Sequence, residues 1–197
     1  MPEISTIFII LCITAYLTGS VSAAIIVCKI MKLPDPRTQG SNNPGATNVL
    51  RIGGKKAAAI TLFGDALKGF VPVIIALLSH QSDVNLAIIG FLAFIGHLYP
   101  VFFQFRGGKG VATAFGVMLA LSLPVSGSLL VTWLLIAYVF KISSFAALIA
   151  ACLSPIYMWI WVGKPELVIM SVIISILLLW RHRANIKHLL SGTEGKI

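Results

Sequence analysis

The sequence is poor in acidic residues and in charge of any kind. Only 11% of its 197 residues are charged, and the six acidic residues stand against fifteen Lys and Arg. A soluble globular domain carries about 25% charged residues, whereas 58% of this chain is hydrophobic. A water-soluble fold is therefore excluded, and so is chemistry that needs many carboxylates.

Cysteine is scarce too, and the few cysteines are not arranged for ligation. Cys12, Cys28 and Cys152 lie in or at the edge of apolar runs without paired spacing. We therefore expect no disulfide framework and no metal site. The basic residues, which give a net charge of +9, lie in short stretches between apolar runs. This pattern indicates membrane topology and no nucleic acid partner.

The N-terminus lacks the basic region that opens a secretory signal peptide. Glu3 precedes the first apolar run, and Lys29, Lys32 and Arg37 follow it. We therefore expect a retained first transmembrane helix with its N-terminus outside.

Long apolar runs supply the transmembrane helices, each of which needs about 20 residues. Clear candidates are residues 4–27, 57–78, 84–105, 145–162 and 167–180. The stretch 111–140 is interrupted by Ser122, Pro124, Ser126 and Gly127. It is either one long span or a hairpin of two short helices of about 15 residues each.

The distribution of positive charge decides between these alternatives. With a hairpin, thirteen Lys and Arg lie on the cytoplasmic side and Lys164 lies outside, whereas a single span divides the charges nine against five. The thirteen are Lys29, Lys32, Arg37, Arg51, Lys55, Lys56, Arg106, Lys109, Lys141, Arg181, Arg183, Lys187 and Lys196. The positive-inside rule thus predicts an all-α integral membrane protein with seven transmembrane helices, two of them short and central. The N-terminus would be outside, the C-terminus cytoplasmic, and residues 1–197 one domain.

The first cytoplasmic loop is rich in side chains that bind phosphate. Pro44 and Gly45 predict a type II turn. This turn would gather five polar residues: Ser41, Asn43, Thr47, Asn48 and Arg51. Arg51 is suited to bidentate phosphate binding, with a hydrogen bond from Ser41. An ordinary solvated loop is the alternative.

The second cytoplasmic loop carries Gly107, Gly108, Lys109 and Gly110 just before an apolar helix. Glycines around a lysine at a helix start allow backbone N–H groups to form an anion nest, which the helix dipole reinforces. The loop is not a Walker A motif, because Gly110 stands where that motif has Ser or Thr. The alternative is a flexible turn with a snorkelling lysine.

Three further groups of polar residues lie in or beside the spans. Asp65 and Lys68 are spaced i, i+3 and should form an ion pair, because either charge alone is costly in hydrocarbon. His97, near the inner end of the third span, is either a packing residue or a functional one. His182 and Asn185 are also spaced i, i+3 and so share one helix face.

These residues fall into motifs that extend over nearly the whole chain. They are Gly19-Ser20; 40–48 with Arg51; Asp65 with Lys68-Gly69; Gly96-His97 with Pro100, Phe102 and Phe105; 107–113; and His182-Arg183 with Asn185-Ile186, Gly192 and Glu194. In these motifs the chain resembles the bacterial acyl-phosphate:glycerol-3-phosphate acyltransferases of the PlsY type. Asn42 stands where the family varies and is given no role.

The resemblance implies a seven-helix enzyme of the bacterial cytoplasmic (inner) membrane with its active site at the cytoplasmic face. Its reaction would transfer a fatty acyl group from acyl phosphate to the 1-hydroxyl of sn-glycerol 3-phosphate. The products would be lysophosphatidic acid and inorganic phosphate, in the first step of phospholipid synthesis. The expected partners are then acyl phosphate, glycerol 3-phosphate and membrane lipid. A further partner would be an upstream enzyme that produces acyl phosphate. Acyl phosphate is already activated, so no cofactor is expected.

The candidate site residues have physical roles in this reaction. Ser41, Arg51, residues 107–110, His182 and Asn185 are candidates for phosphate binding, and Asn43, Thr47, Asn48, Asp65 and Lys68 for support. The catalytic candidates are Ser41, His97 and Lys109. No acidic general base is evident, so we expect direct transfer without an acyl-enzyme. His97 is then either the base or a structural support, and a substrate phosphate oxygen is the other acceptor for the proton.

Two other classes of protein remain as alternatives. A small transporter would use Asp65, Lys68 and His97 as an intramembrane relay. Its weakness is that polar residues are scarce in the outer half of the spans. The second alternative, a non-catalytic lipid-binding protein, does not explain why two loops carry residues suited to phosphate binding.

Overall fold

The regular secondary structure of the described residues is entirely helical. The computed structural model describes residues 5–196 and contains no strand in that range, which confirms the all-α prediction. Glu3 and the predicted start of the first span at Ile4 lie outside the described residues. The chain groups into two compact units, one ending at Leu121 and the other beginning at Ser122.

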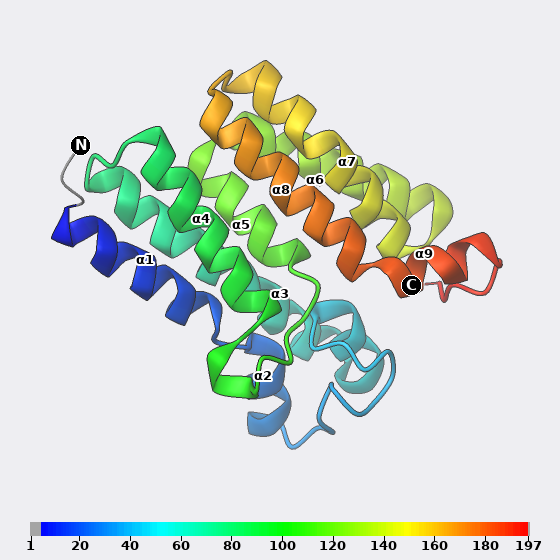
Figure 1. Cartoon of the computed structure of the whole chain (residues 1–197). Coiled ribbons are helices and arrows are strands. Elements are labelled where there is room, and N and C mark those ends of the chain that lie inside the picture. Colours follow the sequence, from blue (N-terminus) through cyan, green and yellow to red (C-terminus); the bar gives the residue numbers. More distant parts are fainter. Residues whose placement is uncertain (1–4, 197) are drawn as a thin grey trace. The chain divides into compact units, whose positions relative to one another are not determined.

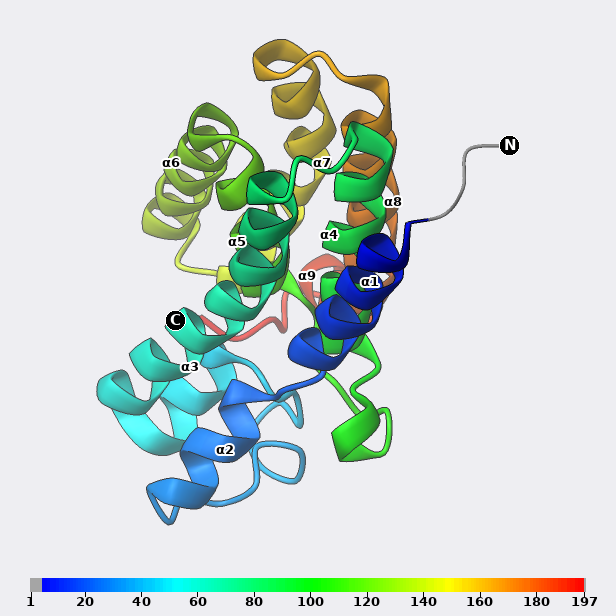
Figure 2. The same ribbon diagram turned by 90° about the vertical axis from the view of Figure 1, so that its left-hand side faces the viewer.

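The first unit contains five α-helices and one short 3₁₀ helix (Figure 1). They are α1 (Thr6–Gly19), α2 (Ala23–Ile30), α3 (Ala46–Leu78), α4 (Asp83–Leu98), η1 (Val101–Phe103) and α5 (Val111–Leu121). Helix α1 packs against α4, and α3 against α5. Figures 1 and 2 both show α1 and α4 side by side. Glycines allow this close approach, because a side chain at Gly19 would collide with the backbone of Ala93, and one at Gly116 with that of Ala66.

The first apolar run is not one helix, so the prediction of an unbroken span over 4–27 was wrong. Helices α1 and α2 meet at a bend of 45°. Ser22 caps α2 by accepting a hydrogen bond from the Ile25 N–H at 3.5 Å. The Val21 carbonyl accepts one from Lys68 Nζ at 2.7 Å. The break is stable because a distant residue binds the carbonyl that the broken helix leaves unbonded.

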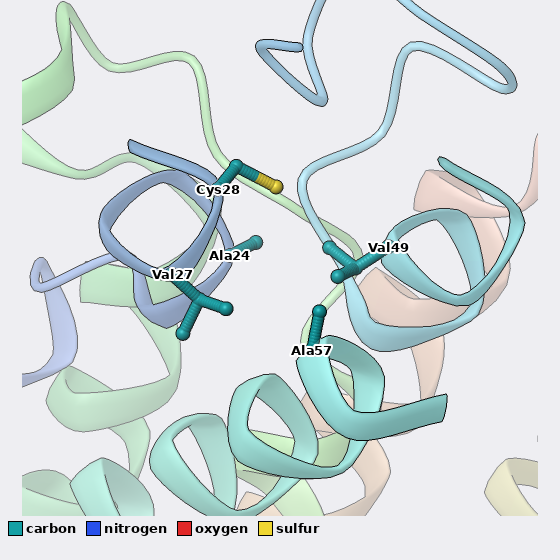
Figure 3. Close-up of a cluster of buried hydrophobic side chains, with 5 residues drawn as sticks. All are labelled: Ala24, Val27, Cys28, Val49 and Ala57. Carbon is teal, nitrogen blue, oxygen red and sulfur yellow. The ribbon is translucent and has the colours of Figure 1, made fainter. Parts of the chain in front are cut away.

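Helix α3 has 33 residues and contains a kink at Gly54, where φ is 77°. Only glycine adopts this conformation readily, so the helix changes direction there. Ahead of the kink, the first turns carry Arg51; beyond it, the helix has the length of a span. Figure 3 shows Val49 and Ala57, from the two sides of the kink, with Ala24, Val27 and Cys28 of α2 in one apolar cluster. This cluster fixes the start of α3, and with it the end of the loop between α2 and α3.

The second unit contains α6 (Leu123–Phe140), α7 (Ser143–Trp161), α8 (Pro165–Arg181) and α9 (Arg183–Leu190). Helix α7 packs against both α6 and α8. Buried hydroxyls join α7 to α8: Ser154 Oγ lies 2.9 Å from Ser171 Oγ, and Ser175 Oγ donates to the Ala151 carbonyl at 2.7 Å. Such bonds between small residues are typical of helices packed in a membrane.

The stretch 111–140 forms two helices, as predicted, but they differ in length. Helix α5 has 11 residues and α6 has 18, so the expected division into two helices of about 15 residues was wrong. Ser122 accepts a hydrogen bond from the Val125 N–H, and Pro124 occupies the first turn of α6. Both residues start a helix at Leu123, so the break lies at Ser122, the first of the interrupting residues expected from the sequence.

The helices have the length and composition of membrane spans. Among the described residues, four helices are long and apolar enough to cross a bilayer, or up to six if each bent pair counts as one span. Helix α5 is apolar but short. Large apolar side chains such as Phe63, Leu135 and Trp159 are more than half exposed, as expected of surfaces that face lipid.

Candidate functional site

The loop between α2 and α3, called the first loop below, is organised around the side chain of Asn48. Its Nδ2 donates to the carbonyls of Pro36 and Gln39, both at 2.9 Å. Its Oδ1 accepts a hydrogen bond from the Ser41 N–H at 2.9 Å. Asn48 is buried and Ser41 is exposed. One buried amide therefore fixes three points of the backbone and presents Ser41 on an ordered loop.

The type II turn predicted at Pro44 and Gly45 is wrong. That turn needs a positive φ at the glycine, but Gly45 has φ −149° and is the N-cap of α3. Its carbonyl accepts the N–H groups of Asn48 and Val49 at 3.0 Å. Because Gly45 has no side chain to cap the helix, its role is to end the loop in extended conformation.

Left-handed backbone occurs earlier in this loop instead. Gly40 has φ 62° and Asn42 has φ 53°. A side chain at Gly40 would also collide with Asn48. Asparagine tolerates the left-handed region better than most residues, so Asn42 suits the backbone at a position to which the sequence assigned no role.

The loop between α4 and α5, called the second loop below, packs directly on α4 and on the first loop. The Gly108 N–H donates to the His97 carbonyl at 3.3 Å. A side chain at Gly108 would collide with His97 Nε2 and approach the Pro44 carbonyl closely, and one at Gly107 would collide with the His97 carbonyl. Gly110 has φ +91° immediately before α5. The glycines thus bring the two loops into contact, in addition to any anion they bind.

Four further predicted residues of this unit lie on the two loops or at the start of α3. Asn43, Thr47 and Lys109 are partly buried. Arg51 is exposed on the first turns of α3, ahead of the Gly54 kink. The structure therefore joins the two loops that sequence analysis proposed separately, with several polar side chains accessible at their surface.

The predicted ion pair between Asp65 and Lys68 is confirmed. Lys68 Nζ lies 2.8 Å from Asp65 Oδ1, and both side chains are buried. His97, which is also buried, places Nδ1 at 3.7 Å from the same Asp65 oxygen. Since Lys68 also binds the Val21 carbonyl, this cluster ties the link between α1 and α2 to α3 and α4. A relay for ions is not favoured, because each charge is held by protein groups.

His182 and Asn185 belong to the second unit, and the single helix face predicted for them was wrong. The chain bends by 60° between α8 and α9, and His182 is the residue at the junction. Its Nδ1 lies 2.8 Å from the Leu178 carbonyl. Asn185 Nδ2 donates to Glu194 Oε1 at 2.6 Å, as does Ser144 Oγ.

Two carboxylates that bind polar side chains in the structure were not predicted to do so. The first is Glu194, which accepts the hydrogen bonds from Asn185 and Ser144; its place in the last motif was the available signal. The second is Asp35, which pairs with Arg37 at 2.7 Å. Hydrogen bonds from Arg37 hold the pKa of the Asp35 carboxyl below its usual value. The spacing Asp-Pro-Arg at the start of the first loop was the available signal.

Comparison with known proteins gives consistent matches over nearly the whole chain. Residues 9–192 match the family model of glycerol-3-phosphate acyltransferase. The glycerol-3-phosphate acyltransferase of Methylococcus capsulatus is 56% identical over 183 residues, which cover 93% of this chain and 92% of the relative. That of Ruthia magnifica is 51% identical over 197 residues, covering 100% and 99%.

Solved structures give the same family. The chain is similar to the crystal structure of PlsY, an integral membrane glycerol 3-phosphate acyltransferase, in its glycerol 3-phosphate form. The TM-score is 0.93 and the identity 39%, over 96% of this chain and 95% of that one. The lysophosphatidic acid form of PlsY matches with a TM-score of 0.90 and 38% identity, with the same coverage.

Proposed function

The chain belongs to the family of integral membrane glycerol-3-phosphate acyltransferases, and we propose that its acyl donor is acyl phosphate. The fatty acyl group is transferred to the 1-hydroxyl of sn-glycerol 3-phosphate, giving lysophosphatidic acid and inorganic phosphate. The observation that carries this proposal is the contact between the two cytoplasmic loops through Pro44 and Gly108. The family match extends from residue 9 to residue 192, so we assign both compact units to one acyltransferase domain.

Binding of two phosphate-bearing substrates is the main task of the site. Ser41 of the first loop, Arg51 at the start of α3 and Lys109 of the second loop supply a hydroxyl, a guanidinium and an ammonium. Charge-assisted hydrogen bonds from such groups are the strong ones for phosphate. The backbone around Gly108 adds N–H donors at the start of α5. His182 and Asn185 of the second unit are proposed separately as phosphate-binding residues, on the basis of their residue types.

The transfer itself is direct in our proposal. The 1-hydroxyl oxygen attacks the acyl carbon, its O–H bond breaks, and the bond from the acyl carbon to the phosphate oxygen breaks. The proton leaves with phosphate as inorganic phosphate. Holding both substrates in one geometry supplies much of the rate, and Lys109 stabilises the negative charge that grows on the reacting oxygens.

His97 acts in this scheme by positioning the second loop. Its carbonyl binds the Gly108 N–H and its Nε2 lies against Gly108. On the other side of the ring, Nδ1 faces Asp65. This placement beneath the loop supports a role as a scaffold and leaves proton acceptance to a substrate phosphate oxygen.

We propose that both loops face the cytoplasm, in the bacterial inner membrane, with the N-terminus outside and seven spans. The distribution of Lys and Arg supports this orientation. Single cysteines replacing Ser82 or Lys164, with Cys12, Cys28 and Cys152 removed, should then react with an impermeant reagent from outside. A cysteine replacing Thr38 should not, and its labelling from outside would overturn the orientation.

The donor is tested with the purified protein in detergent and labelled glycerol 3-phosphate. Separate reactions contain acyl phosphate, an acyl thioester or no donor, and lysophosphatidic acid is measured. We expect product with acyl phosphate alone. Turnover with the thioester and none with acyl phosphate would refute the donor assignment.

A further inference from the structure

A pocket of about 440 Å³ lies in the first unit, between the two cytoplasmic loops. It is lined by Arg37, Thr38, Asn42, Pro44, Arg106 and Gly107. A volume of this size is within the range of small-molecule sites, about 300–1,000 Å³. Of these residues, only Gly107 is among the phosphate-binding residues proposed above.

The lining is positively charged and contains no carboxylate. Arg37 Nε and Nη2 bind the nearby Asp35 carboxylate, with the shortest contact at 2.7 Å. A guanidinium has five N–H donors, so Arg37 is held in place and keeps donors for a ligand. Arg106 is exposed, and no carboxylate within residues 5–196 pairs with it. The two arginines therefore leave an excess of positive charge at the pocket.

The walls of the pocket are ordered by the contacts already described. Asn48 binds the backbone on both sides of Arg37 and Thr38, at Pro36 and Gln39. Thr38 Oγ1 donates to the Asp35 carbonyl at 3.1 Å. On the opposite wall, Gly107 and Gly108 pack on His97. The arginines thus project from fixed backbone, which lowers the entropy lost when a ligand binds.

We propose that this pocket is a second phosphate subsite, which binds a phosphate monoester through Arg37 and Arg106. Planar guanidinium groups match phosphate oxygens bidentately, and Asn42 also lines the pocket. The assignment of its natural ligand rests on the proposed function, because direct transfer holds two phosphate-bearing substrates at once and releases the phosphate of the acyl donor as inorganic phosphate. The same chemistry is offered by a water-soluble phosphate and by a lipid-linked one.

Binding is tested by protection of a cysteine placed in the pocket. Thr38→Cys is alkylated in purified detergent-solubilised protein, and modification of residue 38 is followed by peptide mass spectrometry. Four reactions contain inorganic phosphate, glycerol 3-phosphate, lysophosphatidic acid or glycerol. We expect at least one phosphate ligand to slow alkylation by about tenfold, the effect of a charged hydrogen bond, and glycerol to leave it unchanged. The ligand that protects identifies the source of the phosphate.

Two variants that each lose one positive charge distinguish binding in this pocket from attraction by the overall positive charge of the protein. Arg106→Gln should abolish protection, whereas Lys29→Gln, the same change at an exposed lysine on α2, should preserve it. Arg106→Gln should also raise KM for the protecting substrate about tenfold and leave kcat within about twofold. Absence of protection by every phosphate, or equal protection in Arg106→Gln, would overturn the subsite. Protection by inorganic phosphate needs no turnover, so it tests the subsite independently of the proposed function. The proposed function is refuted by a different result, namely that the wild-type enzyme makes no lysophosphatidic acid.

Discussion

The first unit contains two groups of polar residues, one whose side chains are paired with other protein groups and one that includes accessible side chains. In the buried cluster, Asp65 and Lys68 bind each other, and Lys68 also binds a backbone carbonyl. On the loops, the buried Asn48 fixes the backbone, while Ser41 and Arg51 are exposed. Polar groups bound by protein stabilise the fold, and accessible ones on a fixed backbone are available to a substrate. Changes in the two groups should therefore affect different properties.

The largest expected effect is on stability, in the buried cluster. Asp65→Ala leaves the Lys68 ammonium without its partner carboxylate, which should lower the free energy of unfolding by about 3–5 kcal/mol. Thermal unfolding in detergent should show this as a fall in Tm of roughly 10 °C. Removing both charges in Asp65→Leu with Lys68→Met should recover most of the loss. A double variant that is folded but inactive would instead give the pair a role in the reaction.

The next effect is on activity, in the second loop. Lys109→Ala removes a preorganised charge and should lower kcat about 10²-fold or more, with little change in Tm. Gly108→Val should be nearly as harmful, because its side chain would collide with His97. Gly127→Ala is the matched control, since a side chain there meets nothing within 4 Å. Near-normal turnover of folded Lys109→Ala and Gly108→Val would reduce this loop to a linker.

These two expectations also show how far the sequence predicts the structure. The helices and the Asp65–Lys68 pair follow from local pattern, because apolar runs and i, i+3 spacing act within one segment. The break after Gly19 does not, since its stability depends on Lys68, which is 47 residues from Val21. The same holds for the site: residue types in each loop suggested phosphate binding, but the packing of Gly108 on His97 and Pro44 is a tertiary contact. The type II turn failed because capping of α3 determines the conformation of Gly45.

A smaller effect is expected at Arg51 and Asn185, two residues that we propose to bind phosphate. Arg51→Lys keeps the charge but loses the planar fork, so KM for at least one substrate should rise about tenfold. Asn185→Ala should do the same and also removes a donor to Glu194. Initial-rate kinetics with each substrate varied in turn provide the measurement. Unchanged kinetics for both substrates in both variants would show that the phosphate assignment is wrong.

The smallest effect concerns pH and the Asp35–Arg37 pair. Since the Asp35 pKa is lowered in the folded protein, its contribution to stability is complete above about pH 4, the usual pKa of Asp. The contribution is lost as pH falls through the lowered pKa. The pair is partly exposed, so the total should stay below about 1 kcal/mol. Asp35→Asn should therefore lower Tm slightly at pH 7 and match the wild type in acid; a constant difference would exclude the linkage.

The central claim is that the accessible loops bring two substrates together and that no protein residue receives the acyl group. It is tested most directly by mixing the enzyme with acyl phosphate alone and measuring the intact protein mass and the phosphate released. We predict no added acyl mass and no burst of phosphate until glycerol 3-phosphate is supplied. A stoichiometric burst with an acyl group mapped to Ser41, the accessible hydroxyl of the first loop, would contradict direct transfer.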